Sequence, residues 1–406
     1  MAGVPPDGEA VPADGQLPPA ALDQLGANSL GIYVHIPFCT SRCGYCDFNT
    51  YTAAELGGGA SRESYASLAV SEVRFARAVL GPAAPPVRTV FFGGGTPTLL
   101  PPANLARILA VIDAEFGLET GAEVTTEANP ESVDQRVLEQ LRAAGFTRVS
   151  LGMQSAASHV LSVLDRSHSP GRAEQCVAWA RSAGFAHVSL DLIYGSPGES
   201  AADWEHSVRS AIAAGPDHIS AYALIVEDGT RLAARIRRGE LAQPDDDEMA
   251  DRYLAADELF GGAGLHWYEI SNWAAAWDAA CQHNLSYWTG GNWWGIGPGA
   301  HSHVGGTRWW NVRHPAAYAQ RVSVGVSPGQ AREVLTGAER RTEQIMLATR
   351  LATGCDISLL SAVGRRAAQA DVADGLTDRD AFGAGRVVLT RRGRLLADAV
   401  IRGLTD

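Results

Sequence analysis

Short apolar runs and longer amphipathic stretches alternate along the chain from Gly31 onward. The runs are rich in β-branched and aromatic residues, and Gly, Pro or Asn follows each of them, which is typical of strands. This pattern predicts strands at Gly31–Ile36, Thr89–Phe92, Glu123–Thr126, Arg148–Gly152, His187–Ile193 and His218–Leu224. The stretches between them predict helices, among them Arg62–Leu80, Ala103–Phe116, Val133–Ala144, Arg172–Ala183 and Ala201–Ala213. Such alternation indicates parallel βαβ units with right-handed crossovers.

Six such units fit two architectures, an open doubly wound sheet or a partial barrel. Polar or special residues stand at or just beyond the C-terminal ends of all six strands: Cys39, Gly94, Glu127, Gln154, Asp191 and Tyr222. In β/α barrels the loops at that end converge on one mouth, where the chemistry takes place. We therefore expect an α/β fold, a partial (β/α)6 TIM-like barrel.

Composition divides the chain into four parts. Residues 1–28 are rich in Pro, Ala and Gly and lack aromatic residues, so we expect a disordered, mobile extension with little core to bury. Residues 29–265 form the barrel. Residues 266–330 are an aromatic-rich segment, and the stretch Trp267–Trp310 holds eight of the ten tryptophans. In residues 331–406, two helical patterns precede a short strand, a wing and an amphipathic helix, which predicts a winged-helix-like packing module.

The 406 residues include no lysine, so all 33 basic side chains are Arg. That excludes a Schiff-base lysine, a pyridoxal-phosphate anchor, a P-loop NTPase and a protein kinase. The net charge of −12 argues against an electrostatic grip on nucleic acid or on an anionic membrane.

The sequence also indicates where the protein resides. No apolar run reaches the roughly 18–20 residues of a membrane span, so we expect no transmembrane segment. Residues 1–41 hold no basic residue, so a secretory signal with a basic start is not expected either. The expected location is the cytoplasm.

Three of the six cysteines, Cys39, Cys43 and Cys46, form a C-x3-C-x2-C cluster in the loop after the first strand. Thiolates this close in a loop indicate a soft metal. Three thiolates suit a [4Fe–4S] cluster that leaves one iron open for a ligand. Zinc would need a fourth ligand, such as His35 or a distant cysteine, and an unmetallated loop is a third possibility.

This spacing, with an aromatic residue before the third cysteine, resembles the radical S-adenosylmethionine (SAM) superfamily. Further segments resemble the oxygen-independent coproporphyrinogen III oxidase-like family and its heme chaperone (HemW) branch: YVHIPFC, FFGGGTPT, SLGMQS, DLIYGSPGE and HNLSYW. The resemblance implies a radical SAM barrel with a HemN-type C-terminal module. It also implies a [4Fe–4S] cluster on three cysteines plus exchangeable SAM, whose reductive cleavage yields methionine and a 5′-deoxyadenosyl radical.

Several residues fit a zwitterionic amino acid joined to ribose. Glycines permit close backbone approach, carboxylates and an amide suit ammonium and hydroxyl groups, and a guanidinium suits a carboxylate. The resemblance assigns SAM contacts to Tyr33, Gly94, Gly95, Thr96, Glu127, Gln154, Arg166 and Asp191. Any one of them alone fits a salt bridge or helix cap at a barrel mouth equally well; their joint order favours the SAM site.

Two features separate a decarboxylating oxidase from a heme chaperone. The resembling oxidases carry a fourth cysteine two positions after the third and a longer N-terminal segment. Here Phe48 takes that position, and 38 residues precede Cys39. The HNLSYW segment from His283 to Trp288 matches the HNxxYW signature of the chaperone branch.

An accessible imidazole is a good axial ligand for heme iron, and aromatic rings stack on a macrocycle. We therefore expect His283 to contact heme, beside a flat-ligand surface built by Trp293, Trp294, Trp309 and Trp310. The alternative is an aromatic mini-core in which His283 is structural. Cys281 is a second candidate ligand, although a buried, inert thiol is the simpler interpretation.

The leading hypothesis is a heme chaperone, connected with porphyrin biosynthesis, that carries heme, SAM and a [4Fe–4S] cluster and delivers heme to an acceptor protein. The sequence identifies neither that acceptor nor the electron donor, and we assign no catalytic residue. The alternative is an enzyme resembling coproporphyrinogen III dehydrogenase, which would decarboxylate a porphyrinogen by radical chemistry. A third hypothesis is a zinc-stabilised binding protein.

Overall fold

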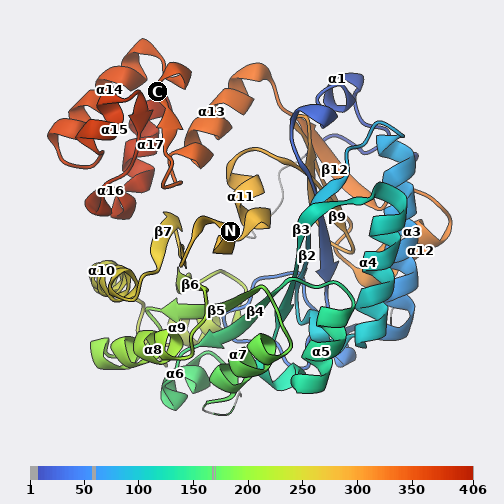
Figure 1. Cartoon of the computed structure of the whole chain (residues 1–406), viewed down its shortest axis with the longest axis horizontal. Coiled ribbons are helices and arrows are strands. Elements are labelled where there is room, and N and C mark those ends of the chain that lie inside the picture. Colours follow the sequence, from blue (N-terminus) through green and yellow to red (C-terminus); the bar gives the residue numbers. More distant parts are fainter. Residues whose placement is uncertain (1–7, 57–60, 167–168, 170, 406) are drawn as a thin grey trace.

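The computed structural model describes residues 8–56, 61–166, 169 and 171–405. Within them, one twelve-stranded sheet runs through the molecule in the order β12-β11-β10-β9-β1-β2-β3-β4-β5-β6-β8-β7 (Figure 1). Its central strands are β1 (Leu30–Ile36), β2 (Val87–Gly94), β3 (Leu118–Ala128), β4 (Arg148–Gln154), β5 (His187–Tyr194) and β6 (His218–Ala223). All six are parallel, in chain order. The predicted α/β fold with a parallel core is confirmed.

Helices connect successive central strands and cover the outer side of the sheet (Figure 1). They are α3 (Arg62–Leu80), α4 (Pro102–Phe116), α5 (Gln135–Ala143), α6 (Ser158–Val163), α7 (Arg172–Ser182) and α8 (Ala201–Ala213), followed by α9 (Arg231–Arg237) and α10 (Asp246–Gly262). The Ser61 hydroxyl caps the first turn of α3, and Gly81 ends this helix at a positive φ of 72°. In the described part of the chain, no helix is both long enough and apolar enough to cross a membrane.

The aromatic-rich segment extends the sheet at both edges. One edge gains β7 (His266–Glu269) and β8 (Asn272–Ala274), which pairs antiparallel with β6. After α11 (Gln282–Trp288), the chain crosses to the other edge, where β9 (Asn292–Ile296) pairs parallel with β1. There β10 (His301–Val304), β11 (Thr307–Asn311) and, after α12 (Pro315–Ser323), β12 (Gly329–Val334) complete the sheet.

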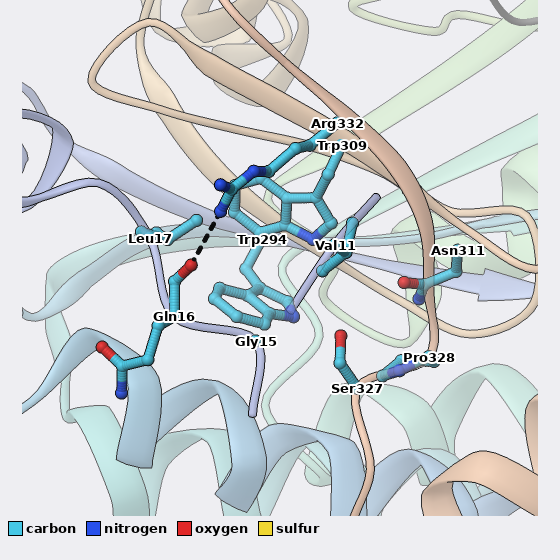
Figure 2. Close-up of a pocket in the computed structure, with 10 residues that line it drawn as sticks. All are labelled: Val11, Gly15, Gln16, Leu17, Trp294, Trp309, Asn311, Ser327, Pro328 and Arg332. Atoms are coloured by element: carbon cyan, nitrogen blue, oxygen red, sulfur yellow. Dashed lines mark hydrogen bonds between the residues drawn. The ribbon is translucent and has the colours of Figure 1, made fainter. Parts of the chain in front are cut away.

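The N-terminal segment is packed in place, which differs from the mobile extension expected for residues 1–28. Leu17 and Leu25 are buried, and the segment includes the short helix α1 (Pro19–Leu22). Figure 2 shows Val11, Gly15, Gln16 and Leu17 around one pocket with Trp294 and Trp309, and the Gln16 carbonyl accepts a 2.9 Å hydrogen bond from Arg332. A few well-spaced apolar side chains therefore outweigh the Pro- and Ala-rich composition. Residues 1–7 lie outside the described residues.

The C-terminal segment has a core of its own, which includes Cys355 and Val387. Its elements are α13 (Gly337–Ala348), β13 (Cys355–Asp356), α14 (Ala362–Ala373), α15 (Arg379–Gly383), β14 (Arg386–Val387), α16 (Arg391–Leu395) and α17 (Ala397–Thr405). Asp257 of α10 pairs with Arg391 at 3.1 Å and with Arg394 at 2.8 Å, which fastens this module to the barrel. The winged-helix-like classification and the three boundaries between the four parts stay predictions.

Leu25→Ala tests the packing of the N-terminal segment. Because Leu25 is 2% exposed, the substitution should lower the free energy of unfolding by about 2–5 kcal/mol through lost burial and a cavity. Denaturant titration of the whole protein measures the change. Asn28→Ala, on an exposed neighbour, is the matched control and should change stability by less than about 0.5 kcal/mol. Equal stability of the two variants would contradict the packing.

Candidate functional site

A cavity of about 570 Å³ opens among the C-terminal ends of the central strands. Every one of the six parallel strands, or the loop after it, contributes to its wall: Cys39 after β1, Gly94 of β2, Glu127 of β3, Gln154 of β4, Asp191 of β5 and Tyr222 of β6. The convergence of six strand ends on one cavity agrees with the predicted barrel mouth. The same cavity reaches down inside the sheet to His218 and His283.

The three clustered cysteines line this cavity together as free, half-buried thiols. Burial and the neighbouring thiols of Cys46 and Cys43 raise the pKa of Cys39 to about 11. Burial also raises the pKa of Cys46. The thiols of Cys39 and Cys46 are therefore protonated at neutral pH in the absence of a metal, and metal binding would displace their protons.

The cysteine loop is held from both sides. At its end, the Asn49 amide nitrogen donates to the carbonyls of Pro298 at 3.0 Å and Arg313 at 2.8 Å. Nearer its start, the Gly44 amide donates to the Leu164 carbonyl at 3.1 Å, and the Gly44 carbonyl accepts from the Leu232 amide at 2.8 Å. The loop thus connects the β9–β12 extension with the segments after β4 and β6.

The donor set fits a soft metal group, since three thiols of one ordered loop face the same cavity. The three thiols do not form a preassembled metal site. The described residues contain no cluster of three or more His, Cys, Asp or Glu side chains close enough to hold a metal ion. Ligation by Cys39, Cys43 and Cys46 therefore stays a prediction.

The glycine turn after β2 requires glycine for steric reasons. Gly94 has a φ of 110°, and a Cβ there would lie 2.7 Å from the His35 ring. A Cβ on Gly95 would lie 2.5 Å from the Phe38 carbonyl oxygen and 3.0 Å from the Cys39 sulfur. The bare backbone therefore passes directly beside the cysteine loop, and Thr96 continues along it by donating its amide to Phe38 at 2.8 Å.

Two carboxylates face the cavity from β3 and β5, the strands on either side of β4. The Glu127 carboxylate accepts the Gly94 amide at 3.0 Å, and the Asp191 carboxylate accepts the Ser150 hydroxyl at 3.0 and 3.1 Å. Burial, together with the negative charge of Asp191, raises the pKa of Glu127 to about 8. Burial also raises the pKa of Asp191. A cationic ligand would relieve this penalty by favouring the charged carboxylates.

Gln154 and Arg166 form a joined pair on the cavity wall. The Arg166 Nε donates to the Gln154 Oε1 at 3.0 Å. Gln154 has a positive φ of 59°, uncommon for a residue other than glycine, at an irregularity in the pairing of β4 with β5. Gly152 makes room for both side chains, because a Cβ there would lie 2.6 Å from Gln154 and 2.7 Å from Arg166. Such strained, crowded placement is typical of a ligand site.

Tyr33 lies deeper along β1. Its hydroxyl is 2.9 Å from the Nδ1 of His35, and the Nε2 of His35 is 2.9 Å from the Asn49 carbonyl oxygen. Tyr33 therefore connects the cavity wall with the end of the cysteine loop. The structure brings all eight predicted SAM residues and the three cysteines to one cavity.

His283 also lines the cavity, but at its floor and with 1% of its surface exposed. Its Nδ1 is 2.8 Å from the Thr89 hydroxyl, and its Nε2 is 2.7 Å from the Tyr287 hydroxyl. Burial lowers the pKa of His283 to about 3, so the ring is neutral. Heme contact by His283 stays a prediction. The ring is buried in this structure, and ligation of iron by Nε2 would require the hydrogen bond to Tyr287 to break.

The tryptophans do not form the expected flat-ligand surface. Trp294, Trp309 and Trp310 are 2–5% exposed, and the rings of Trp294 and Trp309 meet edge to face at 4.8 Å. Trp293 is half-buried and donates its Nε1 to the His301 carbonyl at 3.0 Å. Trp294, Trp309 and Trp310 therefore belong to the core, as the alternative interpretation holds.

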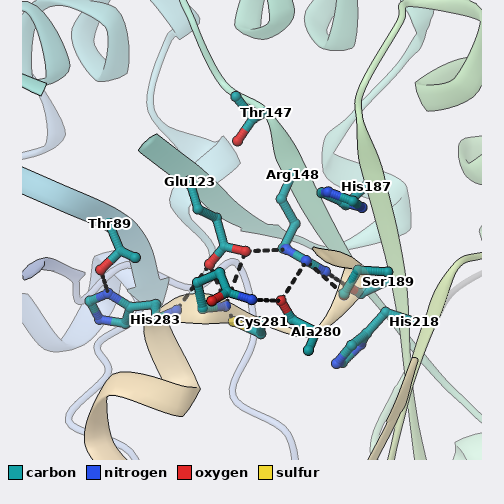
Figure 3. A network of polar contacts seen from close by, with 12 residues as sticks. Thr89, Glu123, Thr147, Arg148, His187, Ser189, His218, Ala280, Cys281 and His283 are labelled. Atoms are coloured by element: carbon teal, nitrogen blue, oxygen red, sulfur yellow. Dashed lines mark hydrogen bonds and ion pairs between the residues drawn. The ribbon is translucent and has the colours of Figure 1, made fainter. Parts of the chain in front are cut away.

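A buried ion pair organises the cavity floor (Figure 3). The Arg148 Nε donates to the Glu123 carboxylate at 2.9 Å, with 1% and 7% of the two side chains exposed. Glu123 also accepts the backbone amides of Gln282 at 3.2 Å and His283 at 3.0 Å. The remaining Arg148 nitrogens donate to Ser189 and to the carbonyls of residues 279 and 280. The pair therefore attaches the start of α11 to the inside of the sheet.

The sequence pattern alone predicts no role for Glu123 and Arg148. The available signal was a charged residue within a strand whose other positions are apolar or small, because such residues are seldom buried unless they are paired. Cys281 belongs to the same network: its thiol lies 3.7 Å from Glu123, and burial raises its pKa. A buried, protonated thiol agrees with the inert role considered for Cys281.

Glu123→Ala should lower the free energy of unfolding by about 3–5 kcal/mol, because it leaves the Arg148 charge buried without its partner. Glu123→Gln should cost less, since its amide oxygen still accepts a hydrogen bond. Denaturant titration monitored by tryptophan fluorescence measures both. Glu119→Ala, at an exposed position of the same strand, is the control and should stay within about 0.5 kcal/mol of the parent. A Glu123→Ala variant as stable as this control would contradict the role of the pair.

Comparison with known proteins agrees with this site. The model of the radical SAM superfamily matches residues 33–211, which include the cysteine loop and five of the six central strands. The solved structure of coproporphyrinogen III oxidase (HemN) from Escherichia coli, described as a radical SAM enzyme, superposes with a TM-score of 0.81. It covers 97% of this chain and 94% of that chain at 22% identity, so this likeness bears on the fold alone.

Two relatives found by sequence share a higher identity with this chain than HemN does. Heme chaperone HemW of Mycobacterium tuberculosis is 52% identical over 383 residues, covering 94% of this chain and 96% of the relative. Heme chaperone HemW of Synechocystis is 35% identical, covering 82% of this chain and 81% of the relative. On this identity and coverage, the chain belongs to the HemW family of radical SAM proteins.

Proposed function

We propose that this protein is a heme chaperone, connected with porphyrin biosynthesis, which binds heme and delivers it to an acceptor protein in the cytoplasm. The observation that carries the proposal is the 52% identity with a heme chaperone across 94% of the chain. The acidic, lysine-free composition is compatible with a protein that binds a small ligand and a partner rather than nucleic acid.

Membership of the radical SAM superfamily implies a [4Fe–4S] cluster and SAM. The residues fit both groups. Cys39, Cys43 and Cys46 supply three thiolates for three irons, and the cluster with SAM supplies one-electron chemistry when bound. Phe48 follows Cys46 by two positions and offers no fourth thiolate.

The other residues of the cavity suit SAM by their chemistry. The Gly94–Gly95 backbone lines the cavity directly beside the cysteine loop, and the Arg166 guanidinium matches a carboxylate. Asp191 and Glu127 offer acceptors for hydroxyl and ammonium groups. Gln154 orients Arg166 through their shared hydrogen bond, and Tyr33 and Thr96 border the same space.

An oxygen-independent coproporphyrinogen III oxidase is the second candidate, favoured by the shared fold with HemN. At 22% identity this likeness does not extend to activity. Phe48, in place of a further cysteine, separates this chain from the pattern expected of the oxidase. The chaperone is therefore the better supported function.

Anaerobic titration of the reconstituted protein with hemin tests the proposal. The chaperone hypothesis predicts saturable binding near one heme per chain, followed by transfer to apomyoglobin as a generic acceptor, both measured by Soret absorbance. In parallel, coproporphyrinogen III, SAM and a reductant should give no decarboxylated product by mass spectrometry. A decarboxylated porphyrinogen would establish the oxidase function instead. Failure to bind heme would rule out the chaperone function.

The raised pKa of Glu127 predicts a pH dependence of SAM binding. A cationic ligand favours the ionised carboxylate, so affinity should rise as the pH increases toward about 8 and level off above it. Below that pH, each unit of acidification should weaken binding by up to about tenfold. Anaerobic calorimetry of SAM binding across this range measures the effect.

Glu127→Gln is the matched variant, because the amide keeps the shape and cannot ionise. It should bind SAM more weakly than the parent at pH 9 and lose most of the slope below pH 8. An unchanged slope would show that another group is titrating. Glu131→Gln, on the outer part of the same cavity, controls for a general change of charge.

A further inference from the structure

Three large apolar side chains at the cavity mouth have no role in the proposed SAM site. Phe48, Tyr222 and Ile225 all line the cavity, yet they expose 56%, 42% and 59% of their surfaces. Phe48 comes from the cysteine loop, whereas Tyr222 and Ile225 come from the end of β6 and the residue stretch after it. Monomeric proteins seldom leave several large apolar side chains exposed around one opening without a ligand or partner.

The polarity of the cavity changes with depth. Its interior wall includes charged, amide and hydroxyl side chains: Glu127, Gln154, Arg166, Asp191, Ser150 and Ser220. Its mouth presents the three apolar side chains beside the carboxylates of Glu131 and Glu227. A polar, zwitterionic ligand therefore suits the interior, and a flat apolar ligand suits the mouth.

The mouth is an ordered platform. Asn49, next to Phe48, is fixed by its two hydrogen bonds to the carbonyls of Pro298 and Arg313. On the opposite side, β6 pairs with β5 as far as Ala223, which lines the same cavity. Pre-positioned apolar groups lose little conformational freedom when a ligand covers them.

The histidines of the cavity lie away from this mouth. His218 begins β6, at the opposite end of the strand from Tyr222, and is 2% exposed. His283 is equally buried, and both of its ring nitrogens have partners. Among the described residues that line the cavity, these are the only histidines.

We propose that heme binds across this mouth, with its macrocycle against Phe48, Tyr222 and Ile225 and above the proposed SAM site, and not through the buried His283. The proposal rests on the proposed chaperone function and adds the place of binding. Glu227 lies on the same mouth, so its charge disfavours propionates there. The methyl and vinyl edge therefore faces the cavity, and the propionates face solvent. Contact without a buried axial ligand also suits a carrier that must release its cargo.

Hemin titration of reconstituted variants tests the proposal. Phe48→Asp and Ile225→Asp should each weaken heme binding by about tenfold or more, because a charge replaces an apolar contact. Cluster absorbance and SAM affinity should match those of the parent. Phe48→Leu, which keeps an apolar side chain, should restore most of the affinity.

Val324→Asp is the matched control, since Val324 is 71% exposed and does not line the cavity. The heme affinities of Val324→Asp and of His283→Ala should both lie within about twofold of the parent's affinity. Two Asp variants that bind heme like the parent, with intact clusters, would overturn the mouth as the site. Loss of heme in His283→Ala alone would place it at the floor instead. If the parent itself binds no heme, the proposed function fails, and this inference fails with it.

Discussion

The buried ion pair between Glu123 and Arg148 is the interaction on which the inside of the barrel depends. Two charges at 2.9 Å, almost without solvent, are stable only if their remaining hydrogen-bonding groups are also satisfied. The partners that satisfy them are the backbone of the segment entering α11. The requirement to solvate one ion pair therefore fixes the HNxxYW helix beneath the cavity, and with it the position of His283.

The same segment controls the other end of the cavity. After α11 the chain forms β9, and the loops after β9 and β11 present the carbonyls that hold Asn49. One stretch of sequence, distant from the cysteines, thus closes the floor and fastens the cysteine loop at the mouth. Its many aromatic residues serve mainly to make this extension of the sheet compact, as the contact between Trp294 and Trp309 illustrates.

The predictable part of the fold was the part governed by local periodicity. Each expected central strand and connecting helix is present, with ends that shift by a few residues, because alternating strands and helices leave strong patterns in the sequence. The cavity residues followed from their place after strand ends. The packed N-terminal segment and the buried His283 did not, because both depend on contacts with residues hundreds of positions away, such as Arg332 and Thr89. No local pattern encodes such contacts.

The lysine-free composition has a particular consequence at the cavity floor. Arg148 uses its Nε for Glu123, one terminal nitrogen for Ser189 and the other for two carbonyls. A planar guanidinium distributes donors over this width, whereas an ammonium concentrates three donors at one point. Arg166 likewise directs its Nε to Gln154 while its Nη2 lies over Gly152. At these two positions the geometry of the contacts therefore requires a guanidinium.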